Sequence, residues 1–244
     1  MSLEQSLEQQ EQAWKERRLL RVIYVEWYRW LADRLSQVPG ESIELGSGIG
    51  KLRAVTGDKV VLTDVELTPW VDAKVDALHL PYQDGSLANI VMLDVFHHLA
   101  DPARFLDEAT RTLASGGRLL MVEPYCSPVS TFFYQHFHHE RTDLSAEVFD
   151  VDLQSATGPM ESNQALPTLA FYRHREETLR RWRQLALVEE RRFAFFVYPL
   201  SGGFSRRPIV PASLYRPLSA LEWCLQPLAP VLAFRCLVVL ESRR

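Results

Sequence analysis

Short apolar runs alternate with helical stretches between residues 42 and 123, and this alternation limits the fold more than any other feature. The runs have the length of strands and lie at residues 42–45, 60–64, 74–76, 89–94 and 118–123. Helical stretches, such as residues 102–113, separate several of them. Strands joined by helical crossovers form a parallel sheet covered on both faces, and ligands bind beyond the carboxyl ends of its strands.

The segments that flank this core have a different character. Residues 7–38 contain no proline or glycine, and their apolar residues recur at helical spacing, which predicts a helical cap over residues 1–40. Residues 125–190 lack strand patterns and are rich in aromatic, histidine and charged residues, so we expect a helical insertion there.

Strand patterns return near the C-terminus. Residues 192–198 and 234–240 are strand-like and predict an antiparallel edge pair, so that residues 191–244 complete the core. The predicted fold class is therefore α/β with a mostly parallel sheet, an antiparallel edge strand and helices on both faces.

The first strand of the core leads directly into "ELGSGIG", with glycine at positions 46, 48 and 50. Alternating glycines after a buried strand allow a sharp turn and a close approach of the backbone to a ligand. A nucleoside triphosphate loop is excluded, because it needs glycine at Leu45 and Ser or Thr at Leu52. The dinucleotide fingerprint fits poorly, because its third small residue would be Lys51.

The remaining pattern, an acidic residue followed by alternating glycines, resembles the class I S-adenosylmethionine-dependent methyltransferases of the small-molecule type. Four ordered landmarks carry the resemblance over about residues 42–124: "ELGSGIG", "KVVLTD", "VDALHLP" and "IVMLDVFHHLADP". The resemblance implies a Rossmann-like sheet of seven strands, with S-adenosylmethionine as the cofactor of a core at residues 41–124.

The resemblance also implies a set of cofactor-binding residues. These are Glu44, Leu45, Gly46, Ser47, Gly48 and Gly50 in the glycine turn, Asp64 and Val65 after the second strand, Asp76 and Ala77 at the adenine edge, and Asp94 after the fourth strand. Asp64 follows Gly46 by 18 residues. A carboxylate there can accept hydrogen bonds from both ribose hydroxyls and would repel a phosphate. For Asp94 the cap of the following helix is an equal alternative.

Methyl transfer from a sulfonium is an in-line displacement, so the protein must align donor and acceptor and supply a base for a hydroxyl or protonated amine. His97 and His98 follow the fourth strand and Glu123 ends the fifth. We expect a catalytic dyad of His98 with Glu123, or of His97 in place of His98, although one of two adjacent histidines commonly packs inward.

A second histidine-rich segment, "FFYQHFHHE", raises the question of a metal site. His136, His139 and Glu140 would share one face of a helix, but the segment is not the HExxH zinc motif. We therefore predict no metal and expect an acceptor pocket, which Phe132, Phe133 and Tyr134 would line, or simple packing.

Composition excludes several classes of protein. The formal net charge of −4 and the pI near 6.0 provide no basic footprint for nucleic acid, and "DVFHH" departs from the signature of the aminomethylating DNA enzymes. The three cysteines show no CxxC spacing, which indicates reduced thiols rather than disulfides or zinc. The N-terminus lacks the pattern of a secretory signal, so we expect a cytoplasmic protein.

We therefore expect a methyltransferase that acts on a hydroxyl or amine of a small molecule. The apolar stretch at residues 211–234, with Arg206 and Arg207 before it, would suit a lipid-like or isoprenoid acceptor or peripheral contact with a membrane. The alternatives are a non-catalytic cofactor-binding scaffold and, less well supported, an NAD(P)-dependent oxidoreductase. The oligomeric state cannot be predicted.

Overall fold

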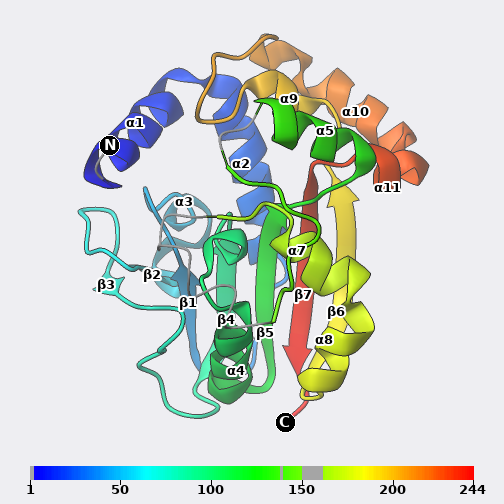
Figure 1. The fold of residues 1–244 in the computed structure, drawn as a ribbon. Helices are drawn as coiled ribbons and strands as arrows, with labels where there is room; N and C mark the ends of the chain where they lie inside the picture. The colour runs from blue at the N-terminus through cyan, green and yellow to red at the C-terminus, as the bar shows by residue number, and fades with distance from the viewer. Residues whose placement is uncertain (1–2, 138–139, 150–161) are drawn as a thin grey trace.

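The computed structural model describes residues 3–137, 140–149 and 162–244. Its centre is a seven-stranded sheet with the strand order β3-β2-β1-β4-β5-β7-β6 (Figure 1). The strands are β1 (Glu41–Leu45), β2 (Val61–Asp64), β3 (Ala73–Lys74), β4 (Leu87–Leu93), β5 (Leu113–Pro124), β6 (Leu185–Phe193) and β7 (Arg235–Ser242). The predicted α/β fold with a mostly parallel sheet is confirmed.

Strand direction separates this sheet from that of dinucleotide-binding domains. Strands β1 to β5 pair in parallel, whereas β7 pairs antiparallel with both β5 and β6. Dinucleotide-binding sheets have the order 3-2-1-4-5-6 and no antiparallel strand inside it. The position of β7 therefore removes the fold-level support for a nicotinamide-dependent oxidoreductase.

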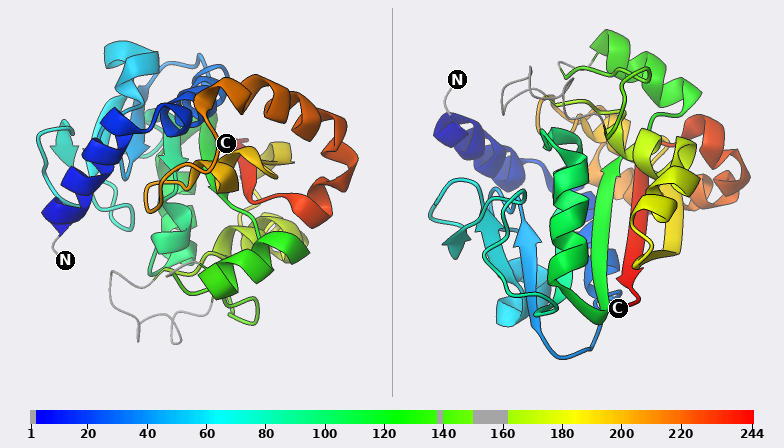
Figure 2. Two further views of the ribbon diagram at one scale, coloured as in Figure 1. Left: turned by 90° about the horizontal axis from the view of Figure 1, so that it is seen from above. Right: turned by 60° about the horizontal axis from the view of Figure 1, so that its bottom comes forward.

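Helices cover both faces of the sheet, with α4, α7 and α8 on one face and α2 and α3 on the other (Figures 1 and 2). The longer helices are α1 (Leu3–Glu16), α2 (Arg18–Ala32), α4 (Pro102–Thr112), α5 (Pro128–Phe137), α8 (Arg175–Arg181) and α10 (Tyr215–Cys224). The short ones are α3 (Arg53–Thr56), α7 (Leu166–Thr168), α9 (Val197–Ser201) and α11 (Ala229–Leu232). Single turns are η1 (Gly57–Lys59), η2 (Phe96–His98), η3 (Leu169–Arg173), η4 (Ala212–Leu214) and η5 (Gln226–Leu228).

Each face of the sheet has its own hydrophobic core, because successive side chains of a strand point to opposite faces. In β4, Ile90 and Met92 pack with Phe105 of α4, whereas Val91 and Leu93 pack on the other side with Trp27 of α2. All of β4 is buried, as expected for a central parallel strand with helices on both faces.

The N-terminal segment forms two helices that meet at Arg17. Tyr24, Trp27 and Tyr28 of α2 are buried against the sheet and belong to the core. Helix α1 instead lies beside the glycine turn, where Glu11 forms an ion pair with Lys51 at 2.6 Å.

Two element boundaries differ from those expected. Strand β6 covers Leu185–Phe193 rather than residues 192–198, because Ala194 has a φ of +62° that ends the extended run. Its middle, "EERR", reads as polar because β6 is an edge strand with one partly solvated face. Helix α4 ends at Thr112, one residue before the expected end of this helical stretch, because the backbone becomes extended at Leu113.

Helices α5, α9, α10 and α11 gather at the end of the sheet where β4, β5 and β6 finish (Figures 1 and 2). This is the edge at which parallel α/β sheets bind their ligands. Among the described residues, none of the helices combines the length and the apolar character that a membrane span requires.

Candidate functional site

The glycine turn after β1 has a backbone that only glycine adopts readily. Gly46, Gly48 and Gly50 have φ values of +64°, +51° and +63°. A Cβ on Gly46 would lie 2.4 Å from Val95 Cγ2, and one on Gly50 would lie 2.4 Å from the Trp70 carbonyl oxygen. Neighbouring parts of the protein therefore demand glycine at two positions, whereas a Cβ on Gly48 would make only ordinary contacts with Leu7 and Gln10 of α1.

Asp64, at the end of β2, lies against this turn. Its Oδ2 accepts a hydrogen bond from the Gly48 N–H at 2.9 Å, and its side chain is only partly buried. The next residue, Val65, leaves 52% of its surface exposed. A carboxylate and an apolar side chain thus stand side by side at the mouth of the turn.

Glu44 lies at the base of the turn, completely buried together with Leu45 and Ser47. Ser47 is held by the fold, since its Oγ accepts the Thr63 N–H at 3.1 Å. Glu44 Oε2 has no hydrogen-bond partner among the described residues. Burial, together with the nearby Asp64 carboxylate, raises the pKa of Glu44 to about 8. A buried carboxyl oxygen without a partner is able to bond a donor or a cation from outside the chain.

Asp76 and Ala77 follow the carboxyl end of β3. Ala77 is buried, whereas Asp76 is exposed and closes its own turn by accepting the Leu78 N–H at 2.9 Å. The second carboxylate oxygen lies 3.1 Å from His79 Nδ1.

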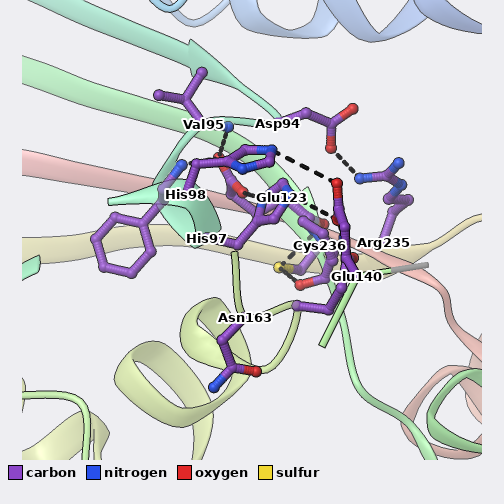
Figure 3. Close-up of polar contacts among 12 residues, drawn as sticks. Asp94, Val95, His97, His98, Glu123, Glu140, Asn163, Arg235 and Cys236 are labelled. Atoms are coloured by element: carbon purple, nitrogen blue, oxygen red, sulfur yellow. Dashed lines mark hydrogen bonds and ion pairs between the residues drawn. The ribbon is translucent and has the colours of Figure 1, made fainter. Parts of the chain in front are cut away.

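The turn after β4 brings His97 together with Glu123 rather than His98 with Glu123 (Figure 3). His97 Nδ1 lies 2.7 Å from Glu123 Oε2, and both side chains are buried. The other oxygen of Glu123 accepts the N–H groups of Val95 and Phe96, each at 2.8 Å. Glu123 therefore fixes both the backbone of the turn and the orientation of the His97 ring.

Glu140 approaches the other side of the histidine pair. Its Oε2 lies 3.6 Å from His97 Nε2, and Gln164 donates a hydrogen bond to the same oxygen. Burial disfavours the charged form of His97, but the carboxylates of Glu123 and Glu140 outweigh it and raise its pKa to about 9. His97 is therefore an imidazolium held between two carboxylates at neutral pH.

His98 has the opposite state. Its side chain is 42% exposed, its ring lies 4.1 Å from that of His97, and its Nε2 lies 3.9 Å from Glu140 Oε1. Partial desolvation of the ring and the positive charge of His97 lower the pKa of His98 to about 4. Of the two histidines, His98 is the neutral one and the one that solvent reaches.

Asp94, at the tip of β4, belongs to a network that crosses the sheet. Its Oδ2 accepts the Tyr24 hydroxyl at 3.0 Å, and its Oδ1 pairs with the buried Arg235 of β7 (Figure 3). Asp94 does not cap the next helix; Asp101 does so by accepting the Arg104 N–H at 2.8 Å. Asp94 has a left-handed φ of +61°, which turns the chain sharply at the end of β4.

Two groups of potential metal ligands lie within the described residues, His97 with His98 and Glu140, and Asp94 with His97 and Glu123. Both depend on His97, whose Nδ1 already bonds Glu123, and Gln164 already bonds Glu140. Donor atoms of His97, Glu123 and Glu140 thus already have partners within the protein.

The histidine-rich segment is arranged differently from the expected helix face. Glu140 lies beyond the end of α5 and faces His97, while His136 bonds the Phe132 carbonyl at 2.8 Å. His138 and His139 lie outside the described residues. Of the three aromatic residues expected at an acceptor pocket, Phe132 and Phe133 are exposed by 54% and 43%, whereas Tyr134 is buried.

Comparison with known proteins now identifies the core. Residues 43–121 match the family model described as "Methyltransferase domain". Over this segment the chain is similar to the methyltransferase domain family. The resemblance to class I S-adenosylmethionine-dependent methyltransferases, and the cofactor that it implies, are thereby confirmed.

Similar proteins extend the likeness beyond the family segment. An uncharacterized 37.1 kDa protein in transposon TN4556 of Streptomyces fradiae is 36% identical over 38% of this chain and 33% of the relative. The match thus spans about a third of the length of that curated relative.

Solved structures share the fold over most of this chain, including the segments outside residues 43–121. Geranyl diphosphate C-methyltransferase from Streptomyces coelicolor A3(2) has a TM-score of 0.54 and 13% identity, over 92% of this chain and 80% of that one. A SAM-dependent methyltransferase from Archaeoglobus fulgidus has a TM-score of 0.55 and 11% identity, over 94% and 97%. At such identities the likeness concerns the fold.

Sequence reasoning did not identify several residues at the edge of this methyltransferase domain. Tyr24 and Arg235 contact Asp94, Glu140 contacts His97, and Gln164 contacts Glu140, but none of the four belongs to a motif. Glu140 is acidic and follows two histidines, which was the only sequence signal for any of these residues. The expectation that Glu140 shares a helix face with His136 and His139 did not indicate its contact with His97.

The His97 pair predicts a pH dependence of stability. The folded pKa of about 9 exceeds the ordinary value of 6.5, so the stabilisation is fully present below pH 6.5 and is lost as the pH rises through 9. The difference corresponds to at most about 3 kcal/mol. We expect the free energy of unfolding, measured with urea, to fall less over this range in His97→Gln than in the wild type.

Other groups that titrate over this pH range are present in both the wild type and His97→Gln, so their contributions cancel when the two pH dependences are compared. Glu44 also destabilises the fold as it ionises up to pH 8, but it is present in both proteins. His174→Gln, at an exposed histidine of α8, should retain the wild-type slope. Equal slopes for His97→Gln and the wild type would show that His97 is not charged in the folded protein.

Proposed function

We propose that the protein transfers the methyl group of S-adenosylmethionine to a hydroxyl or amine of a small, lipid-like acceptor. The observation that carries this proposal is the contact between the glycine turn and the turn after β4. Val95 occupies the space in which Gly46 would carry a side chain, and Val95 stands between Asp94 and the two histidines. Donor loop and candidate base therefore belong to one site, as an in-line displacement requires.

The residues of the glycine turn fit the cofactor chemically. Asp64 offers a partly exposed carboxylate for the ribose hydroxyls, next to the exposed Val65. The Glu44 oxygen that lacks a partner suits the α-ammonium group of the methionine part, whose positive charge would favour the ionised carboxylate. When bound, the cofactor supplies an electrophilic methyl group.

His98 is the proposed base. It is neutral at pH 7, because its pKa is about 4, and its ring is accessible to an acceptor. A weak base is sufficient, because the acceptor proton becomes strongly acidic as the bond to the methyl group forms. The proton can then leave through Glu140, 3.9 Å away. Glu123 and His97 act as positioning residues that hold the turn beneath His98.

The acceptor class rests on the surroundings of the strand ends. Apolar side chains of α5, α10 and α11 remain exposed there, and such surfaces are expected to lie beside oily ligands or partners. The similar enzyme from Streptomyces coelicolor acts on geranyl diphosphate, an isoprenoid, at carbon. For this chain, His98 favours an acceptor that loses a proton, hence a hydroxyl or amine.

The proposal predicts that His98→Ala lowers the rate of methyl transfer by about 100-fold or more, the usual contribution of a general base. Turnover is measured with tritiated S-adenosylmethionine against fractionated small molecules and lipids. The binding of S-adenosylhomocysteine, measured by calorimetry, should remain unchanged, because His98 lies on the acceptor side. His174→Ala is the matched control and should retain full turnover.

The outcomes separate the rival functions. If His98→Ala transfers methyl groups at the wild-type rate, His98 is not the base. If the wild type binds S-adenosylhomocysteine but labels no fraction, the non-catalytic scaffold is the better description.

A further inference from the structure

Helices α10 and α11, with the turns beside them and α5, display an unusual number of apolar side chains to solvent. We call this set the apical surface. Its members are Phe132, Phe133, Phe137, Ile209, Leu214, Leu221, Trp223, Leu228 and Val231, exposed by 41% to 76%. None of the residues of α10 is buried. A surface helix of a globular protein normally buries its apolar stripe. In α10 only Tyr215 and Leu218 pack partly against the core, whereas Leu221 and Trp223 remain exposed.

The apical surface is continuous rather than scattered. Helix α5 packs against α11, and the Phe133 ring lies 5.5 Å from that of Phe234, just after α11. At the other end of α5, Arg206 donates a hydrogen bond to the Phe137 carbonyl at 3.2 Å, which joins the loop before α10 to the same surface. Figures 1 and 2 place these helices together at one end of the molecule.

The charges on this surface have one sign, although the whole chain carries −4. Arg206, Arg207 and Arg216 are exposed along its border. The segment from residue 203 to 232 contains one acidic residue, Glu222, and α5 contains none. Glu222 turns inward, where its Oε1 accepts the N–H groups of Phe196 at 2.6 Å and Val197 at 2.7 Å.

Exposed tryptophan, phenylalanine and leucine bordered by arginine are typical of helices that lie in the interface of an anionic membrane. We propose that the apical surface binds the surface of an anionic phospholipid bilayer, with α10 and α11 lying in the headgroup layer. The carboxyl ends of β4 and β5 then face the lipid. Docking itself is independent of methyl transfer; the delivery of a lipid-like acceptor to the site rests on the proposed function.

Sedimentation of the full chain with vesicles tests this inference. The probes are phosphatidylcholine vesicles with and without phosphatidylglycerol. We expect binding to the anionic vesicles, weaker binding to the neutral ones, and release by salt. The variant Arg207→Ser/Arg216→Ser should lose about fivefold in affinity for each arginine removed. The variant Trp223→Ser/Leu228→Ser should lose about tenfold or more, because both side chains are removed from the lipid contact.

Matched controls distinguish docking from damage to the fold and from the methyltransferase function. Val188→Ser removes an apolar side chain that is 45% exposed on β6, outside the apical surface, and should bind vesicles like the wild type. All variants should retain the wild-type thermal unfolding and affinity for S-adenosylhomocysteine, because the substituted side chains are solvent-exposed.

Two results would overturn the inference. The first is a wild type that sediments with neither kind of vesicle while it still binds S-adenosylhomocysteine. The second is a dimer, detected by light scattering, that the Trp223→Ser/Leu228→Ser variant abolishes, because a second copy would then cover the apical surface.

Discussion

Replacing Arg235 with methionine is expected to lower the free energy of unfolding by about 3 kcal/mol or more, the usual cost of breaking a buried ion pair on one side. Arg235 is 5% exposed and pairs with Asp94 across the sheet. Its guanidinium also donates to the Tyr198 hydroxyl at 2.6 Å and lies 5.5 Å from the Trp27 ring centroid. Methionine fills much of the volume but leaves the Asp94 carboxylate without its cation.

The effect is measured by urea denaturation at neutral pH. Arg118→Met is the control, because Arg118 on β5 pairs with Glu241 at 2.9 Å near the surface and should contribute less than about 1 kcal/mol. The double variant Asp94→Asn/Arg235→Met should recover part of the loss, since neither charge then remains. A loss below that of Arg118→Met would show that the ion pair does not hold α2, β4 and β7 together.

The parts of this fold that could be predicted from the sequence depend on local order along the chain. The glycine turn, Asp64 at the end of its strand and the buried β4 each follow from a short run of residues. Their spacing is maintained because a parallel sheet repeats one strand and one crossover at a time. The match of residues 43–121 to the methyltransferase domain family covers the same part of the chain.

The histidine pair shows where local reasoning reaches its limit. His97 and His98 are adjacent in η2, and nothing in the sequence distinguishes the one that points inward. The fold decides, because Glu123 on the neighbouring strand bonds the backbone of the turn and leaves one oxygen for His97. The same contact makes His98 the exposed member and brings Glu123 to His97, the second of the two expected pairings.

Contacts between distant segments could not be predicted. Arg235 reaches Asp94 because the antiparallel β7 lies next to β5, and Glu140 reaches His97 because the insertion returns over the turn after β4. In both cases the partners are about 40 to 140 residues apart, with no spacing rule to connect them. The polar residues in the middle of β6 likewise gave no strand pattern, because an edge strand need bury only one face.

Replacing Asp64 with alanine is expected to weaken the binding of S-adenosylhomocysteine by about 100-fold or more. Hydrogen bonds to a charged group contribute about 1.5 to 3 kcal/mol each, and a ribose offers two hydroxyl donors to one carboxylate. Asp64→Asn should lose less, because the amide oxygen still accepts one of them. Calorimetry with S-adenosylhomocysteine gives both affinities.

Asp64→Ala could also weaken binding by disturbing the glycine turn, because Asp64 Oδ2 accepts the Gly48 N–H. Asp72 provides the matched control. It immediately precedes β3, accepts the Leu62 N–H of β2 at 2.9 Å and pairs with Arg53, but it is not one of the predicted cofactor residues. Asp72→Ala should therefore disturb the backbone of β2 while it leaves the affinity within a few-fold of the wild type. If Asp64→Ala binds S-adenosylhomocysteine as well as the wild type does, the ribose lies elsewhere and the cofactor does not occupy the edge formed by Gly48 and Asp64.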